Sequence, residues 1–217
     1  MINPDYEMIE NFVLNLEQGY VNNARDNGGE TNFGISKRAY PKEDIKNLTL
    51  DRARQLYKRD YWDKIQGDRI PTPVALMFFD LAINSGVSGA TKMLQKLVNV
   101  KADGKVGDGT IKAIENAWLD HGDTLLDSLT EKRMDLYKNH EDWDAFGKGW
   151  TRRAYETRDA SYNLSSFEKQ EIDLLPDNSP EKAALTTFGK AFKLARSSGK
   201  DVFTYKGKEY TTKLKTG

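Results

Sequence analysis

The stretch that decides the fold reads Leu16-Glu17-Gln18-Gly19-Tyr20 and then Asp26-Asn27-Gly28-Gly29-Glu30-Thr31-Asn32-Phe33-Gly34-Ile35-Ser36. The residues before it predict a helix from Pro4 to Gln18, because apolar side chains recur there at helical spacing, at Met8, Ile9, Phe12, Val13 and Leu16. Gly19 is expected to end this helix. Residues 21–36 are rich in Asn, Asp and Gly, which predicts turns with at most short strands.

The rest of the first 163 residues is expected to be mostly helical. Helical spacing predicts further helices at residues 49–65, 74–82, 88–98, 109–119, 124–139 and 143–162. Residues 74–82 are apolar on nearly every side, which is typical of a buried helix. We therefore expect a mainly α fold, a helical globule with a small β or loop wing after the first helix.

Composition narrows the classes of function. The 217 residues carry 33 Lys and Arg against 33 Asp and Glu, and zero net charge argues against general binding of nucleic acid. Cys is absent, which excludes disulfides and thiol nucleophiles. No apolar run is long enough for a membrane span, and the first residues do not resemble a signal peptide.

The balanced charge hides an uneven distribution. Residues 1–158 carry 23 basic and 25 acidic side chains, residues 159–180 carry one and five, and residues 181–217 carry nine and three. We expect a body at 1–163, an acidic linker at 164–180 and a basic tail at 181–217. A helix at 180–198 and a β-hairpin at 202–212, turning at Lys206-Gly207, are expected in the tail.

Glu17 and Asp26 are the candidate catalytic carboxyls. Glu17 falls in the last turn of the expected helix, beside its apolar face, where partial burial and the negative end of the helix dipole both raise a carboxyl pKa. Such a group suits a general acid, whereas Asp26 in a wet turn is expected to stay ionised. Two carboxyls with opposed environments are the pattern for cleavage of a glycosidic bond, and Thr31 is a candidate for holding water.

The same stretch offers candidate substrate-binding residues. Tyr20 and Phe33 are expected to pack on sugar rings, with Asn32 beside them, and the glycines allow close approach of the backbone to a ligand. The plainer alternative is that Glu17 is a solvated surface residue and that the glycine-rich stretch is only a loop.

The stretch resembles glycoside hydrolase family 108, the N-acetylmuramidases of phages and prophages. The resemblance is carried by Glu17-Gln18-Gly19-Tyr20-Val21-Asn22 and by Asp26-x-Gly-Gly-x-Thr-Asn-Phe-Gly-Ile-Ser, with Gln18 where the family commonly has Gly. The order Glu, Asp, Thr is also similar to the catalytic trio of phage-type lysozymes, although Thr31 follows Asp26 one residue sooner. The resemblance covers residues 5–162 and implies a lysozyme-like fold with catalytic Glu17, Asp26 and Thr31.

Other motifs extend the resemblance. Asp60-Tyr61-Trp62-Asp63, residues 80–86 and Leu94-Gln95 are similar to the middle helices of the family, and residues 103–110 resemble a turn of small peptidoglycan-binding helical domains. Trp62 and Asn84 are candidate sugar-binding residues. Trp62 could equally be a core residue, and Asp80 with Asn84 could be buried polar residues satisfied by loop backbone. The Gly104–Gly109 stretch is expected to be a tight turn rather than a phosphate loop.

The resemblance implies hydrolysis of the β-1,4 bond between N-acetylmuramic acid and N-acetylglucosamine in bacterial peptidoglycan, which needs no cofactor. His121 and His140 lack a ligand pattern, so no catalytic metal is expected. A lytic transglycosylase giving anhydro products is the first alternative, and a virion structural or peptidoglycan-binding protein with a vestigial enzyme core is the second.

The tail resembles a short element of phage virion-associated proteins. Residues 181–217 are therefore expected to dock on phage tail or other virion proteins, or to bind an anionic partner, with a solvated tail as the plainer alternative. The implied location is either the virion or the host cytoplasm, with release to the periplasm at lysis.

Overall fold

A computed structural model describes residues 4–16, 21–22, 29–174, 202–205 and 208–211. The first helix, α1 (Pro4–Leu16), leads into a small antiparallel sheet of β1 (Val21–Asn22), β2 (Glu30–Asn32) and β3 (Ile35–Ser36). The expected wing of turns and short strands is thus confirmed. The expected helix end at Gln18 lies outside the described residues.

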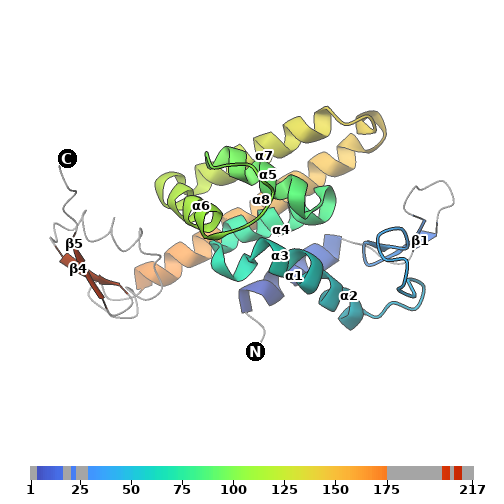
Figure 1. The fold of residues 1–217 in the computed structure, drawn as a ribbon, viewed down its shortest axis with the longest axis horizontal. Coiled ribbons are helices and arrows are strands. Elements are labelled where there is room, and N and C mark those ends of the chain that lie inside the picture. Colours follow the sequence, from blue (N-terminus) through green and yellow to red (C-terminus); the bar gives the residue numbers. More distant parts are fainter. Residues whose placement is uncertain (1–3, 17–20, 23–28, 175–201, 206–207, 212–217) are drawn as a thin grey trace.

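Helices make up the rest of the body (Figure 1). The elements are α2 (Leu50–Tyr57), the π-helix η1 (Lys58–Trp62), α3 (Asp63–Ile65), the 3-10 turn η2 (Gly67–Arg69), α4 (Thr72–Ser85), α5 (Val87–Leu97), α6 (Asp108–His121), α7 (Asp123–Lys138) and α8 (Trp143–Leu174). The mainly α, lysozyme-like fold class is therefore confirmed.

Two expected boundaries need correction. The single helix expected at residues 49–65 contains the π-helical turn η1, which sequence spacing does not reveal. The helix expected to end at residue 162 continues to Leu174, so the first part of the segment expected as an acidic linker is helical. Further on, β4 (Val202–Tyr205) and β5 (Lys208–Thr211) pair as the expected hairpin, whereas the helix expected at 180–198 lies outside the described residues.

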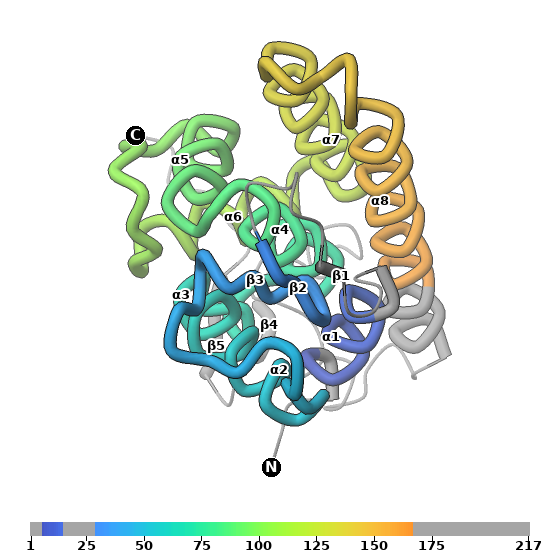
Figure 2. The backbone as a smooth tube through the Cα atoms, turned by 90° about the vertical axis from the view of Figure 1, so that its right-hand side faces the viewer, coloured from blue at the N-terminus to red at the C-terminus, as the bar shows by residue number. Residues whose placement is uncertain are grey.

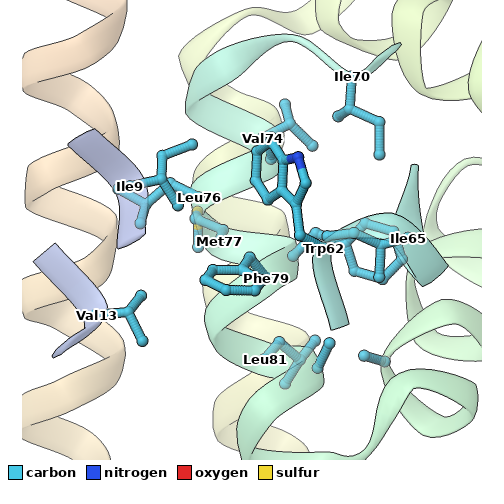
Figure 3. Close-up of a cluster of buried hydrophobic side chains, with 14 of the residues drawn as sticks. Ile9, Val13, Trp62, Ile65, Ile70, Val74, Leu76, Met77, Phe79 and Leu81 are labelled. Atoms are coloured by element: carbon cyan, nitrogen blue, oxygen red, sulfur yellow. The ribbon is translucent and has the colours of Figure 1, made fainter. Parts of the chain in front are cut away.

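Helix α4 is the centre of the fold, as its all-round apolar sequence predicts. Every residue from Pro73 to Ala82 is buried, and α4 packs against α1, α5, α7 and α8. Figure 3 shows Ile9 and Val13 of α1 facing α4, with Trp62 and Ile65 on its other side. Burial of this apolar surface is the main stabilising term of the fold.

Aromatic side chains fill the space between α1, η1 and α4. The ring of Trp62 lies 4.9 Å from that of Tyr6 and 5.5 Å, edge to face, from that of Phe79. Such tilted and edge-to-face pairs add to the burial term. This packing fixes the direction of α1, at whose end the wing begins (Figure 2).

Candidate active site

The wing is built around a two-residue turn. Strand β2 pairs with β1 (Val21 opposite Thr31) and with β3 (Asn32 opposite Ile35). Phe33 and Gly34 connect β2 to β3 with φ of +50° and +73°. Positive φ at both central residues is typical of a type I′ turn, which suits Gly but strains Phe. The Tyr57 hydroxyl donates to the Phe33 carbonyl at 2.8 Å and so holds the strained residue in place.

Asn32 and Thr31 lie on opposite faces of β2, because side chains alternate along a strand. The Asn32 amide is buried and donates to the carbonyls of Ile45 (3.1 Å) and Leu48 (3.5 Å). Asn32 therefore ties β2 to the loop before α2, and the expectation that its side chain binds sugar is wrong. Thr31 is half-buried, and its hydroxyl donates to the Gly29 carbonyl at 3.3 Å.

The other expected site residues fall into two groups, those outside the described part of the chain and those that the structure places. Glu17, Tyr20 and Asp26 lie outside the described residues. Trp62 is 1% exposed and its indole donates to Asp68 at 3.0 Å, so the expectation that it stacks on a sugar is wrong, and it is a core residue. Asn84 is exposed in the last turn of α4, with its amide donating to the Asp80 carbonyl at 2.8 Å.

A polar cluster beside the wing was not predicted. The Tyr40 hydroxyl donates to Asp60 at 3.0 Å, and Arg59 donates to both oxygens of Asp60 at 2.6 and 2.7 Å. Hydrogen bonding by Arg59 lowers the pKa of Asp60, which stays ionised. Tyr40 also closes the turn after β3, since its amide donates to the Ser36 carbonyl at 3.0 Å. Asp60 lies in the Asp60-Tyr61-Trp62-Asp63 stretch noted in the sequence, but only the fold brings Tyr40 to it.

Glu10 is a buried carboxyl on α1, and its exposed fraction is 5%. Burial raises its pKa, while a hydrogen bond from Tyr6 (2.6 Å) and the charge of Arg54 (3.3 Å) oppose the rise. A raised carboxyl pKa suits a general acid, yet this group faces the protein interior. Glu10 therefore serves to hold α1 against α2 rather than to contact a polymer.

Asp80 is the centre of a buried charge network. The carboxylate is fully buried and lies 2.6 Å from Arg133 of α7 and 2.7 Å from Arg153 of α8. Burial raises its pKa, but the two guanidinium charges outweigh this effect and lower it. The Thr157 hydroxyl donates to Asp80 at 3.2 Å. Asp80 is thus satisfied by distant side chains, not by loop backbone, and it joins α4 to α7 and α8.

Gln95 organises residues 103–107, which bend at Gly104; the turn expected at Gly104–Gly109 is shorter, because Asp108 and Gly109 already belong to α6. The Gln95 amide nitrogen donates to Asp103 (2.9 Å), the Lys105 carbonyl (3.0 Å) and Thr110 (3.1 Å), and its oxygen accepts from the Gly104 amide (2.9 Å). Gly104 has φ of +78°, a conformation that favours glycine. One buried amide therefore fixes the turn that precedes α6.

A groove of about 410 Å³ lies between α5, α6 and α7. It is lined by mixed polar and apolar side chains, among them Leu97, Asn99, Asn116, Asp120, Thr124 and Ser128. The hydroxyls of Thr124 and Ser128 donate to the carbonyls of His121 and Thr124. The groove belongs wholly to the second half of the body.

The buried helix α4, the small antiparallel wing that follows α1 in the chain and the second helical half joined through Asp80 define a mainly α, lysozyme-like fold. Residues 10–86 match the family model of glycosyl hydrolase 108, and residues 89–155 match a model described as "Predicted Peptidoglycan domain". The chain belongs to glycosyl hydrolase family 108 and is a peptidoglycan hydrolase with a peptidoglycan-binding half.

Among solved structures, the chain is similar to that of SagA from Brucella abortus. The two share 34% sequence identity with a TM-score of 0.68, and the match covers 74% of this chain and 95% of SagA. A comparison with curated proteins finds no match.

Two features are absent from the described part of the chain. No helix there has the length and apolar character to cross a bilayer. No group of three or more His, Asp or Glu side chains among those residues is arranged to hold a metal ion.

Proposed function

We propose that the chain is an N-acetylmuramidase that cleaves the β-1,4 bond between N-acetylmuramic acid and N-acetylglucosamine, with Glu17 as general acid. The observation that carries the proposal is the position of Glu17 in the chain. It directly follows Leu16, the last residue of α1, inside the residues that match the hydrolase family. The sequence predicts that this position is the last turn of the helix, where a carboxyl would be disfavoured in its charged form, as the role of a general acid requires.

Asp26 and Thr31 would orient the attacking water. Thr31 lies on the face of β2 opposite the buried Asn32, and its hydroxyl donates its hydrogen to the Gly29 carbonyl. The oxygen keeps lone pairs that can accept a hydrogen bond from water. Ionised Asp26 would accept the other hydrogen or stabilise positive charge on the sugar ring in the transition state.

Phe33 and Tyr20 would support sugar rings at the same site. Phe33 keeps a strained positive φ, and its carbonyl is held by Tyr57. Strained backbone that the surrounding structure maintains is often found where a ligand is clamped. Asn84, exposed at the end of α4, would contact the glycan away from the cleaved bond.

Lysis of outer-membrane-permeabilised cells tests the catalytic assignment. The full chain should clear a turbid suspension, and Glu17→Gln should lower the rate at least a hundredfold, in line with the usual contribution of a general acid of about 10²–10⁴. Glu7→Gln is the matched control, because Glu7 is an exposed carboxyl on the same helix. Equal lysis by Glu17→Gln and Glu7→Gln would refute the assignment.

We also propose that the enzyme belongs to a phage, as a virion-associated lysin or an endolysin. The support is the resemblance of residues 181–217 to an element of virion proteins, together with the described hairpin of β4 and β5. Detection of the chain in purified phage particles would support the virion lysin. Detection only in lysing host cells would support the endolysin, and absence from both would contradict the phage assignment.

A further inference from the structure

The end of α7 and the start of α8 carry an aromatic corner, formed by Tyr137, His140, Trp143, Phe146 and Trp150. Trp143, Phe146 and Trp150 follow helical spacing of three and four, which places them on one face of α8. Trp150 is the hub, with ring centroids 5.3 Å from Tyr137, 5.1 Å from His140 and 6.0 Å from Phe146. The α7–α8 pair carries this corner away from the centre of the body (Figure 2).

The aromatic corner is separate from the main core. Tyr137 packs with Met134 and Ala154 in a small second cluster, against which Trp143 and Trp150 are partly buried. Phe146 is 57% exposed, the highest value among the exposed large apolar side chains of the described residues. Its ring lies nearly parallel to that of Trp150, at an interplanar angle of 28°. Phe146 does not stand alone, because its ring stacks on that of Trp150, and a contiguous apolar surface of this kind often marks a ligand-binding site.

The corner is also held rigidly. Gly147 is buried, and a Cβ at this position would lie only 2.6 Å from Cε3 of Trp143, so the Trp143 ring rests directly on backbone. The Trp143 amide donates to the His140 carbonyl at 3.0 Å, and the Phe146 amide donates to the Asp142 carbonyl at 3.0 Å. The rings are therefore positioned before any ligand arrives, which lowers the entropic cost of binding.

Charge and area narrow the class of ligand. Between Tyr137 and Arg152 the sequence carries three basic and three acidic residues, namely Lys138, Lys148, Arg152, Glu141, Asp142 and Asp144. This balance gives no attraction to an anionic lipid surface or to nucleic acid. A Phe side chain presents about 200 Å², so the exposed 57% amounts to about 110 Å², far below the roughly 800 Å² per partner of a stable protein interface.

We propose that the aromatic corner binds a sugar ring of the peptidoglycan glycan strand, with the pyranose face on Phe146 and Trp150. A pyranose has an apolar C–H face and a polar rim, and its apolar face matches the exposed Phe146 ring stacked on Trp150. The corner lies inside residues 89–155, which match the peptidoglycan domain. The inference rests on peptidoglycan as the substrate and adds a glycan contact remote in sequence from Glu17. The groove between α5 and α7 has no large aromatic lining and offers no such platform.

Binding to purified, insoluble peptidoglycan tests the proposal, with the full chain at 4 °C and sedimentation as the readout. Phe146→Ala should weaken binding about three- to tenfold, the range expected from one ring contact of 0.5–1.5 kcal/mol. Phe146→Leu should weaken it as much, since it keeps apolar bulk but lacks the ring, whereas Phe146→Trp should retain binding. Tyr155→Ala is the matched control, because Tyr155 is 41% exposed on the same helix.

Unchanged binding by Phe146→Ala would overturn the proposal, as would retained binding by Phe146→Leu or an equal loss in Tyr155→Ala. Asn116→Leu alters the groove between α5, α6 and α7. Loss of binding in this variant with no loss of binding in Phe146→Ala would also overturn the proposal. Equal thermal midpoints of the Phe146 variants and the parent chain exclude unfolding as the cause. The sedimentation assay at 4 °C measures binding and the lysis assay measures cleavage, so failure here is distinguishable from failure of Glu17 as the acid.

Discussion

Replacing Asp80 with Asn is expected to destabilise the body strongly. Asp80 is fully buried between Arg133, which is 1% exposed, and Arg153, which is 17% exposed. Asn keeps the shape of the side chain but removes its charge, so Arg133 and Arg153 lose the buried carboxylate that they share. The cost therefore falls on the contact between α4 of the hydrolase half and α7 and α8 of the peptidoglycan-binding half.

The magnitude follows from the burial of the network. Removing one partner of a buried ion pair costs about 3–5 kcal/mol. We expect the lower part of this range, about 3–4 kcal/mol, because Arg153 keeps some contact with water. For a chain of this size, about 2–4 °C of thermal midpoint is lost per kcal/mol. The midpoint of Asp80→Asn should therefore fall by about 6–16 °C.

The dependence on pH has a definite sign. The charges of Arg133 and Arg153 outweigh burial and lower the pKa of Asp80 below its unfolded value of about 3.9. Its stabilisation is thus fully present above that value and is lost only as pH falls through the lowered folded pKa. The stability difference between the parent chain and Asp80→Asn should stay constant from pH 7 to about 5 and narrow in more acidic solution.

Urea unfolding followed by circular dichroism measures these differences. Asp135→Asn is the matched control, because Asp135 is exposed on α7 and lies 3.8 Å from Lys132, and it should change the free energy of unfolding by less than about 0.5 kcal/mol. A loss below about 1 kcal/mol for Asp80→Asn at pH 7, or a loss equal to that of the control, would refute the role given to the network.

Three further substitutions test other contacts. Gln95→Leu should lower the free energy of unfolding in urea by about 2–3 kcal/mol. It should also speed hydrogen exchange of the Gly104 amide, because this amide loses its buried acceptor, and an unchanged exchange rate would contradict this. Gly67→Ala should lower the thermal midpoint by several degrees, because the new Cβ would overlap the Trp62 ring, and a neutral effect would contradict the packing. Burial raises the pKa of Glu10. Glu10→Gln should therefore change the free energy of unfolding at pH 7 by less than about 1 kcal/mol and the rate of lysis less than twofold. Loss of lysis would assign Glu10 a catalytic role.

The elements that depend on local sequence were predictable. A run that is apolar on nearly every side, interrupted only by Asp80, is expected to be buried, and this pattern predicted α4 as the buried helix. The glycine and Asn-rich stretch gave the wing, and alternation around Lys206-Gly207 gave the hairpin of β4 and β5. In each case the signal lies within about ten neighbouring residues.

The long-range contacts were not predictable from one sequence. Arg153 reaches Asp80 across 73 residues, and the ring of Trp62 is covered by α1 and α4, so neither partner follows from spacing. The buried side of Asn32 depends on the loop that carries Ile45. The glycine after Phe33 was a weak indication of the positive φ at Phe33, because two-residue hairpin turns often contain glycine.

Mass analysis of the products from purified peptidoglycan tests the central claim most directly. Hydrolysis by the full chain should release disaccharide-peptides that end in reducing N-acetylmuramic acid and carry one added water, and Glu17→Gln should release at least a hundredfold less. Reducing N-acetylglucosamine ends, anhydro products without the added water, or undiminished release by Glu17→Gln would contradict the account.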